Sequence, residues 1–238
     1  MLYTQTVAPE TLELLKRLES EPFMDSFSLA GGTALALYLG HRVSVDLDLF
    51  TPESFDEKQL EFSLRHKYGF QTKFTAQHTL KGTIGGVNDC IAHRYKSLRP
   101  PHMESGLRLY DMEDIIAMKL AAISDDGSRL KDFIDMAFLS TRFSLDSMLR
   151  CFERKFPFSN VLGPVKGLLY FDDINFGEKV FIPAYEYSWE NIALRLRDMS
   201  LQQDHVFDTA PLARHKDCRE EKVPEDNDTP GQKHGRRR

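Results

Sequence analysis

The chain has 238 residues, of which 41% are hydrophobic and 28% charged, a composition typical of an ordinary globular protein of one or two domains. No stretch approaches the about 20 apolar residues of a membrane span, and the N-terminus lacks the pattern of a secretory signal. Three widely spaced cysteines form no CxxC motif, which predicts a reducing cytoplasm. The net charge of -5 argues against nucleic-acid binding through bulk positive charge.

Residues 1–110 have the mixed helix and strand pattern of an α/β domain. Leucines at helical spacing predict an amphipathic first helix, and Gly40 predicts the end of a second one. Strict alternation predicts that Val45, Leu47 and Leu49 face the core from one strand. The predicted helices span 9–20, 33–39 and 55–68, and the predicted strands span 27–30, 45–50 and two or three runs within 70–95.

After Pro100 and Pro101 the pattern becomes helical. Asp111 is typical of an N-cap, and an acidic residue follows three positions later, as in a capping box. We therefore expect an α/β domain at 1–110, a helical domain at 111–205 and a charged tail at 206–238 whose composition favours disorder. The predicted helices of this part span 111–122, 128–142, 145–156, 160–170 and 189–201.

The segment from Gly31 to Asp48 carries the clearest chemical pattern. Because side chains alternate along a strand, Asp46 and Asp48 lie on one face, about 7 Å apart. Two such carboxylates repel each other unless a cation lies between them, and a hard divalent cation such as Mg²⁺ suits oxygen ligands. Upstream, Gly31 and Gly32 let backbone N–H groups approach a phosphate at the start of a helix, where the Thr33 hydroxyl can cap the helix or touch that phosphate.

Each piece alone is more typical of a plain turn or a solvated strand edge. Together, with thirteen residues at 33–45 between them, they resemble the active-site signature of polymerase-β-like nucleotidyltransferases. The runs Ala-Gly-Gly-Thr-Ala-Leu at 30–35 and His-Arg-x-Ser-x-Asp-Leu-Asp-Leu-Phe at 41–50 are similar to the AbiEii/AbiGii-type toxin family of abortive-infection toxin–antitoxin systems. Further runs resemble the same family in the same order, at 80–87, 112–123, 131–136 and 168–173.

This resemblance, which covers about residues 10–205, implies a nucleotidyltransferase-type mixed sheet flanked by helices, with the helical region completing the active site. It implies that Asp46 and Asp48 hold Mg²⁺ and that Lys119 adds a positive charge to the site. Such a site suits nucleotidyl transfer, which needs positioning and charge neutralisation more than covalent chemistry. The catalytic positions that it implies are Asp46, Asp48, Lys119 and Asp132. The nucleotide-binding positions are Gly31, Gly32, Thr33, Arg42 and Ser44.

Alternatives stay open at several of these positions. Lys119 could lay its stem along apolar helix surface, and Lys131 and Asp132 could form a surface ion pair. Arg42 could steady the triphosphate or pair with a strand aspartate. Asp135 lies one turn from Asp132 and could pair locally instead of doing chemistry.

A third carboxylate is usual in polymerase-β-like enzymes, and Asp89 is the acid in the matching strand. It would be a third metal ligand if the strand register turns it toward the other two. If it faces away, Asp132 serves as the base or the chemistry is altered. His41 and His93 could bind substrate or satisfy local hydrogen bonds.

The aromatic residues predict packing more than base stacking. Arg94-Tyr95-Lys96 is the one run in which an aromatic residue lies between basic ones, as a stacking platform requires. We expect these other aromatics to pack the helical half: Phe152, Phe156, Phe158, Tyr170, Phe171 and Trp189.

The sequence and the resemblance together predict an Mg²⁺-dependent enzyme that moves an NMP unit from an NTP to an acceptor. The resemblance adds a toxin role, an RNA acceptor such as tRNA and a cognate antitoxin. Two other functions fit the same residues: phosphotransfer from a nucleotide to a protein or small alcohol, and nucleotide binding without catalysis. The uncertain third carboxylate keeps the last of these open.

Overall fold

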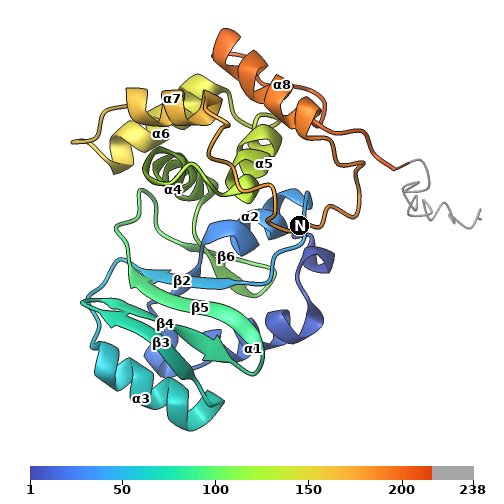
Figure 1. Ribbon diagram of the computed structural model, residues 1–238. Coiled ribbons are helices and arrows are strands. Elements are labelled where there is room, and N and C mark those ends of the chain that lie inside the picture. The colour runs from blue at the N-terminus through green and yellow to red at the C-terminus, as the bar shows by residue number, and fades with distance from the viewer. Residues whose placement is uncertain (216–238) are drawn as a thin grey trace, which may run out of the picture.

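The computed structural model describes residues 1–215, apart from the side chains of residues 88–91. Within this part, seven strands form one mixed sheet in the order β3-β4-β5-β2-β1-β7-β6. Helix α2 lies between this sheet and a group of helices, α4 to α8 (Figure 1). The strands are β1 (Ser28–Leu29), β2 (Leu47–Thr51), β3 (Gln71–Ala76), β4 (Thr79–Ile84), β5 (Val87–Arg94), β6 (His102–Glu104) and β7 (Leu107–Leu109). The helices are α1 (Pro9–Glu19), α2 (Gly31–Leu39), α3 (Glu57–Tyr68), α4 (Met112–Asp125), α5 (Leu130–Leu139), α6 (Leu145–Lys155), α7 (Leu162–Leu169) and α8 (Trp189–Leu201), with short 3-10 turns at Thr4–Thr6 and Pro22–Met24.

Strand β2 lies in the middle of the sheet, antiparallel to β1 and parallel to β5. Leu47 and Leu49 are buried, as the alternation predicted, but Val45 is 51% exposed, so its predicted core position is wrong. The strand begins at Leu47, and Ser44, just before Val45, instead forms an isolated bridge with Val7. Val45 therefore lies outside the ladder, where the strand alternation does not apply.

Two short strands, β6 and β7, were missed by the sequence reasoning. Ser105 and Gly106 join them through positive φ angles, and β7 pairs in parallel with β1 through Leu29 and Leu109. A strand of three residues is too short for its alternation to stand out from a loop. These strands complete the edge of the sheet beyond β1.

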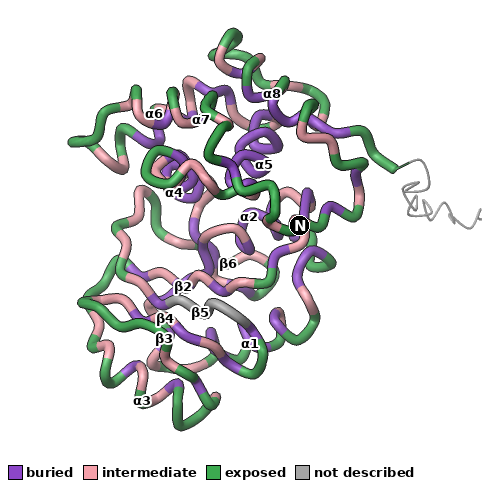
Figure 2. The backbone as a smooth tube through the Cα atoms, in the orientation of Figure 1, coloured by how far each residue is buried: buried purple, intermediate pink, exposed green. Residues whose placement is uncertain are grey.

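Helix α2 carries the glycine turn into the core. Its residues Ala34 to Leu37 are fully buried, and it contacts β2, α4 and α5. The helix ends at Gly40, whose φ of 68° is the left-handed cap predicted from the sequence. Figure 2 shows buried segments in α2 and α5, between the sheet and the outer helices.

Helix α4 begins as predicted at Asp111, whose side chain accepts a hydrogen bond from the Glu113 backbone N–H. The expected acidic partner, Asp114, has another role, because it is fully buried and accepts bonds from the backbone N–H groups of Leu98 and Arg99. Lys155 Nζ lies 2.5 Å from Asp114 Oδ1. This buried pair holds the segment after β5 against the helices.

The C-terminal part of the described chain crosses the helical half. Phe207 donates its backbone N–H to Ser140 O at 2.9 Å, and Leu212 is buried. Residues 206–215 of the expected tail therefore pack against the fold, and residues 216–238 lie outside the described part. Among the aromatics expected to pack here, Phe158 and Tyr170 are exposed instead. No helix among the described residues is both long and apolar enough to span a membrane.

Candidate active site

The glycine turn and the aspartate strand meet because glycine leaves room for a carboxylate. Gly31 has a φ of 63°, and a Cβ built on it would overlap the Asp48 carboxylate. A Cβ on Gly32 would lie 2.5 Å from Arg42 Nη2. Any side chain at these positions would displace Asp48 or Arg42, so packing favours glycine at both, and the positive φ favours it at Gly31 as well.

Thr33 and Ser44 hold the chain that leads into the aspartates. The buried Thr33 Oγ1 lies 2.9 Å from Ser44 Oγ and also contacts the backbone oxygen of Asp46. Ser44 also donates its backbone N–H to Thr6 O at 2.9 Å. Both hydroxyls therefore fix the segment at 44–46 from behind.

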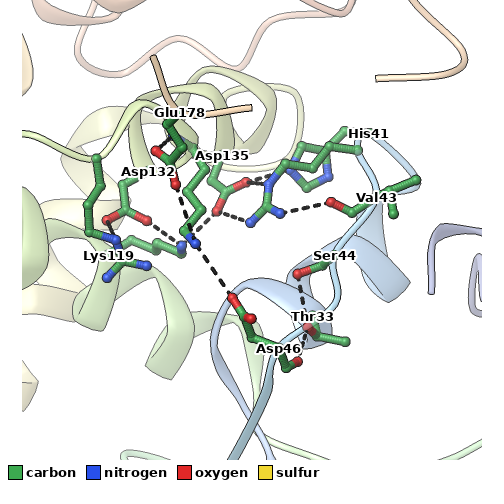
Figure 3. Close-up of polar contacts among 12 residues, drawn as sticks. Thr33, His41, Val43, Ser44, Asp46, Lys119, Asp132, Asp135 and Glu178 are labelled. Carbon is green, nitrogen blue, oxygen red and sulfur yellow. Dashed lines mark hydrogen bonds and ion pairs between the residues drawn. The ribbon is translucent and has the colours of Figure 1, made fainter. Parts of the chain in front are cut away.

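Asp135 lies at the centre of a buried ionic cluster (Figure 3). It accepts two hydrogen bonds from the Arg42 guanidinium, at 2.6 and 2.9 Å, and contacts His41 Nε2 at 2.7 Å and Lys119 Nζ at 2.7 Å. Burial alone would raise the pKa of Asp135, but Arg42 and Lys119 hold it well below the usual range. Burial lowers the pKa of His41, so the ring is neutral and Asp135 is neutralised by Arg42 and Lys119.

Lys119 connects this cluster to the second acid of α5. Its Nζ lies 2.5 Å from Asp132 Oδ1, and Arg129 Nε lies 3.4 Å from Asp132 Oδ2. Burial alone would lower the pKa of Lys119, but Asp135 and Asp132 outweigh it and raise the pKa. The ammonium group is therefore kept charged and fixed in position by two carboxylates.

A cavity of about 600 Å³ lies between β2 and helices α4 and α5. At its edge, Lys131 Nζ lies 3.5 Å from Asp46 Oδ2 and 3.4 Å from Glu178 Oε1 (Figure 3). The cavity therefore combines the N-terminus of α2, four carboxylates and several cationic side chains, which suits a polyanion with a bound cation. Its lining residues are Gly31, Gly32, Asp46, Asp48, Phe50, Lys81, Tyr95, Ile115, Met118, Lys119, Ala121, Ala122, Asp125, Arg129, Lys131 and Asp132.

Asp48 is the strand acid with the clearest electrostatic signature. Burial and the neighbouring charge of Asp46 raise the pKa of Asp48 to about 6, against the opposing effect of Lys119, Arg129 and Lys131. Burial and the Asp46 charge therefore outweigh these three cations at Asp48.

The structure brings six of the predicted site residues together in the cavity wall and leaves three behind it. The six are Gly31, Gly32, Asp46, Asp48, Lys119 and Asp132. The other three, Thr33, Arg42 and Ser44, are buried and do not line the cavity. Arg42 pairs with Asp135 and not with a strand aspartate, while the side chain of Asp89 lies outside the described residues.

Sequence reasoning missed two residues that shape this site. Lys131 was treated only as half of a surface pair, and Asp135 only as a local partner. The one signal available for them was their spacing on a helix with Asp132, since Lys131 and Asp135 flank it within one turn. Their main partners, Asp46 and Arg42, lie more than 80 residues away in the chain.

The donor atoms of Asp46 and Asp48 fit a hard divalent cation. Both are carboxylates that line the cavity, and Lys131 approaches Asp46 only to 3.5 Å. Among the described residues no three metal-ligating side chains converge. Two carboxylates suit Mg²⁺, which commonly keeps waters and substrate phosphates as its other ligands.

Comparison with known proteins places the chain in the class of nucleotidyl transferases. Residues 13–101 and 95–232 match a family model described as nucleotidyl transferase AbiEii toxin, Type IV TA system. The chain belongs to this AbiEii family. The resemblance stated from the sequence motifs is thereby confirmed, and so is the mixed α/β fold class.

Individual proteins are also similar to this chain. An uncharacterized protein of Aquifex aeolicus strain VF5, aq_aa25, is 33% identical over 196 residues, which cover 77% of this chain and 90% of that protein. The crystal structure of JHP933 from Helicobacter pylori has a TM-score of 0.49 and 19% identity, covering 83% of this chain and 93% of that one. An antigenic nucleotidyltransferase-like protein from Paracoccidioides brasiliensis has a TM-score of 0.37 and 15% identity, covering 85% and 99% of the two chains.

Proposed function

We propose that this protein transfers an NMP unit from an NTP to an acceptor hydroxyl in the cavity between β2, α4 and α5. The observation that carries the proposal is one cavity wall that contains Gly31, the Asp46–Asp48 pair and the fixed ammonium of Lys119. These groups come from three separate elements of the fold. Together they supply what a triphosphate and its cation need.

In the proposed reaction, the acceptor oxygen bonds to the α-phosphorus, and the bond from that phosphorus to the pyrophosphate oxygen breaks. The hydroxyl proton leaves to solvent and pyrophosphate departs. Lys119 and the rim cations Arg129 and Lys131 offset the charge that develops on the phosphate oxygens. Mg²⁺ held by Asp46 and Asp48 would supply further charge neutralisation and orient the triphosphate.

Asp132 and Asp135 act in this proposal through Lys119. Asp132 is 1% exposed and its Oδ1 is bonded to Lys119 Nζ, and Asp135 is fully buried. Both carboxylates are committed to cations, which suits positioning better than proton transfer. Thr33, Ser44 and Arg42 support the nucleotide site from behind its wall, by holding the strand acids and Asp135.

The acceptor and the biological setting are part of the proposal. The Type IV toxin–antitoxin description of the family supports a toxin role with a cognate antitoxin, and an RNA such as tRNA is the acceptor that we propose, in the cytoplasm. The net charge of -5 disfavours a wide electrostatic footprint on RNA. We therefore expect the protein to engage a limited part of the acceptor near the cavity.

The test follows the position of a radioactive phosphate. The protein is incubated with Mg²⁺, total RNA and each NTP labelled at either the α- or the γ-phosphate. We expect label on RNA from the α-phosphate only, and a loss of at least about 1,000-fold in the double variant Asp46→Ala with Asp48→Ala, because the cation is no longer held. Asp204→Ala with Asp208→Ala removes two exposed acids and serves as the matched control.

Three outcomes would contradict the proposal. Transfer of the γ-label would indicate a phosphotransferase. Activity that survives in the Asp46 and Asp48 double variant would remove these residues from the site. Nucleotide binding without transfer to any RNA, protein or sugar acceptor would indicate a binding protein.

A further inference from the structure

The cavity has two chemically different ends. Asp48 and Phe50 share one face of β2, and Asp46 lies just before the strand; all three line the cavity. The four residues of chain from Asp46 to Phe50 span at most about 14 Å. The wall therefore changes from acidic to aromatic over a distance comparable to that from the phosphates of a nucleotide to its base.

Helix α4 forms the opposite wall and changes in the same way. Lys119 lies beside the acids, whereas Met118, Ala121 and Ala122 present partly exposed apolar side chains to the cavity. Ile115 completes this wall one turn earlier and is fully buried. Asp125, the next cavity-lining residue of α4 after Ala122, adds a negative charge that acts on Tyr95. Apolar side chains and this acid therefore enclose a space that a charged phosphate would avoid.

Tyr95 is held in place at this apolar end. Its ring stacks on Phe50, with centroids 5.8 Å apart and planes 14° from parallel. Its backbone N–H donates to Thr51 O at 2.7 Å, and its carbonyl accepts from the Tyr110 hydroxyl at 3.0 Å. Lys155 Nζ lies 4.7 Å from the ring centroid. A ring fixed in this way loses little freedom when a ligand binds.

We propose that the apolar end of the cavity binds the nucleobase of the incoming NTP between the α4 side chains Met118 and Ala122 and the Phe50–Tyr95 pair. The proposal rests on the proposed nucleotidyl transfer, which places the triphosphate at the polar end. Every nucleobase has a flat face of low polarity, and contact of that face with aromatic and apolar groups is favourable for each of the four bases. The cavity of about 600 Å³ lies within the range of pockets that enclose a small ligand.

The experiment compares ligands that differ only in the presence of a nucleoside. Calorimetry measures the affinity of the full-length protein for each of the four NTPs and for inorganic tripolyphosphate, all with Mg²⁺. We expect at least one NTP to bind more than about tenfold more tightly than tripolyphosphate. The variant Tyr95→Ala should lower the affinity for that NTP by about 5- to 150-fold, the range measured for loss of a stacking ring. Its affinity for tripolyphosphate should stay unchanged.

Three further variants keep this test independent of folding defects. Tyr95→Phe retains the ring and should retain the NTP affinity. Ala122→Phe should fill the apolar end and so lower the affinity for the NTP but not that for tripolyphosphate. Phe158→Ala removes a fully exposed aromatic residue outside the cavity, and it should change neither affinity. Unchanged tripolyphosphate binding shows in each variant that the polar end is intact.

Several results would overturn this inference while leaving the proposed function standing. The first is that the wild type binds NTPs and tripolyphosphate with equal affinity. The second is that Tyr95→Ala lowers the affinity for both ligands equally. The third is that Tyr95→Ala changes only the KM for the RNA acceptor. The last would place the acceptor's base in this end of the cavity. Failure of the wild type to bind either ligand would overturn the proposed function itself.

Discussion

Two pairs of acids lie at or behind the cavity wall, and they differ in how they are neutralised. Asp46, just before β2, and Asp48, on β2, are partly exposed, and their closest ion pair among the described residues is from Lys131 to Asp46 at 3.5 Å. On α5, Asp132 and Asp135 are at most 1% exposed, and basic groups surround them at 2.5 to 3.4 Å. The pKa of Asp48 is raised, whereas that of Asp135 is lowered.

This difference separates a pair that needs a cation from a pair that already has its cations. The α5 acids are saturated with ion-pair partners from the chain itself and fix Lys119 and Arg42, although Asp132 Oδ2 accepts no hydrogen bond among the described residues. The β2 acids remain under-neutralised and face the cavity, where an external cation can approach. The same residue type thus serves positioning in one pair and ligand binding in the other.

The largest effect on stability should come from breaking the saturated pair. Asp135→Ala leaves the buried Arg42 without its carboxylate partner and leaves Lys119 with Asp132 alone. An uncompensated buried charge of this kind lowers the free energy of unfolding by about 3–5 kcal/mol. Urea denaturation at pH 7 measures this loss. The exposed variant Asp204→Ala should stay within about 0.5 kcal/mol of the wild type. A loss below about 1 kcal/mol in Asp135→Ala would contradict the assigned role.

Asp46 and Asp48, the open pair, should respond in the opposite sense. Asp48→Asn should raise the free energy of unfolding, because it removes a charge that the fold disfavours. A carboxyl whose pKa rises from 3.8 to about 6 on folding contributes stability below pH 4, and that stability is lost as the pH rises through 6. The amide introduced by this substitution does not titrate. Without Mg²⁺, the free energy of unfolding of the variant should therefore rise relative to that of the wild type between pH 4 and 7, by at most about 3 kcal/mol.

Adding Mg²⁺ sharpens this second prediction. The cation should raise the Tm of the wild type at pH 8 and leave Asp48→Asn nearly unchanged. Glu19 provides a control, since burial raises its pKa to about 7 although it accepts hydrogen bonds from the Arg108 backbone outside the cavity. Glu19→Gln should also gain stability above pH 7, yet it should keep the full Mg²⁺ response. A loss of that response in Glu19→Gln would contradict the metal assignment.

The open pair could be predicted from the sequence because its signal is local. Alternation predicted a common face for Asp46 and Asp48. Both line the cavity although Asp46 lies one residue before β2, and Leu47 and Leu49 are buried as predicted. The glycine turn was similarly local. Alternation failed only at Val45, next to the point where the chain pairs with Val7 instead of continuing the strand.

The saturated pair could not be predicted, because its partners are distant in the chain. Asp135 meets His41 and Arg42 across more than 90 residues, and nothing in the helix at 128–142 indicates which acid faces them. Asp132 and Lys119 came from the resemblance to a family and not from their spacing. Tyr95 shows the same limit, since it follows β5 whereas its stacking partner Phe50 lies on β2.

The smallest and most specific effect should be on Mg²⁺ affinity and should come from Lys131, which pairs with both Asp46 and Glu178. Its Nζ lies between Asp46 Oδ2 at 3.5 Å and Glu178 Oε1 at 3.4 Å. Lys131→Gln removes a cation that competes for Asp46, so the affinity for Mg²⁺ should rise. Glu178→Gln leaves Lys131 to Asp46 alone and removes a nearby negative charge, so the affinity should fall. Each change should be at most about fivefold, because both side chains are about a quarter exposed.

Metal titration of the nucleotide-free protein measures the Mg²⁺ affinity of both variants. Competition for Asp46 requires that the two affinities change in opposite directions. A general disturbance of the site would change them in the same direction.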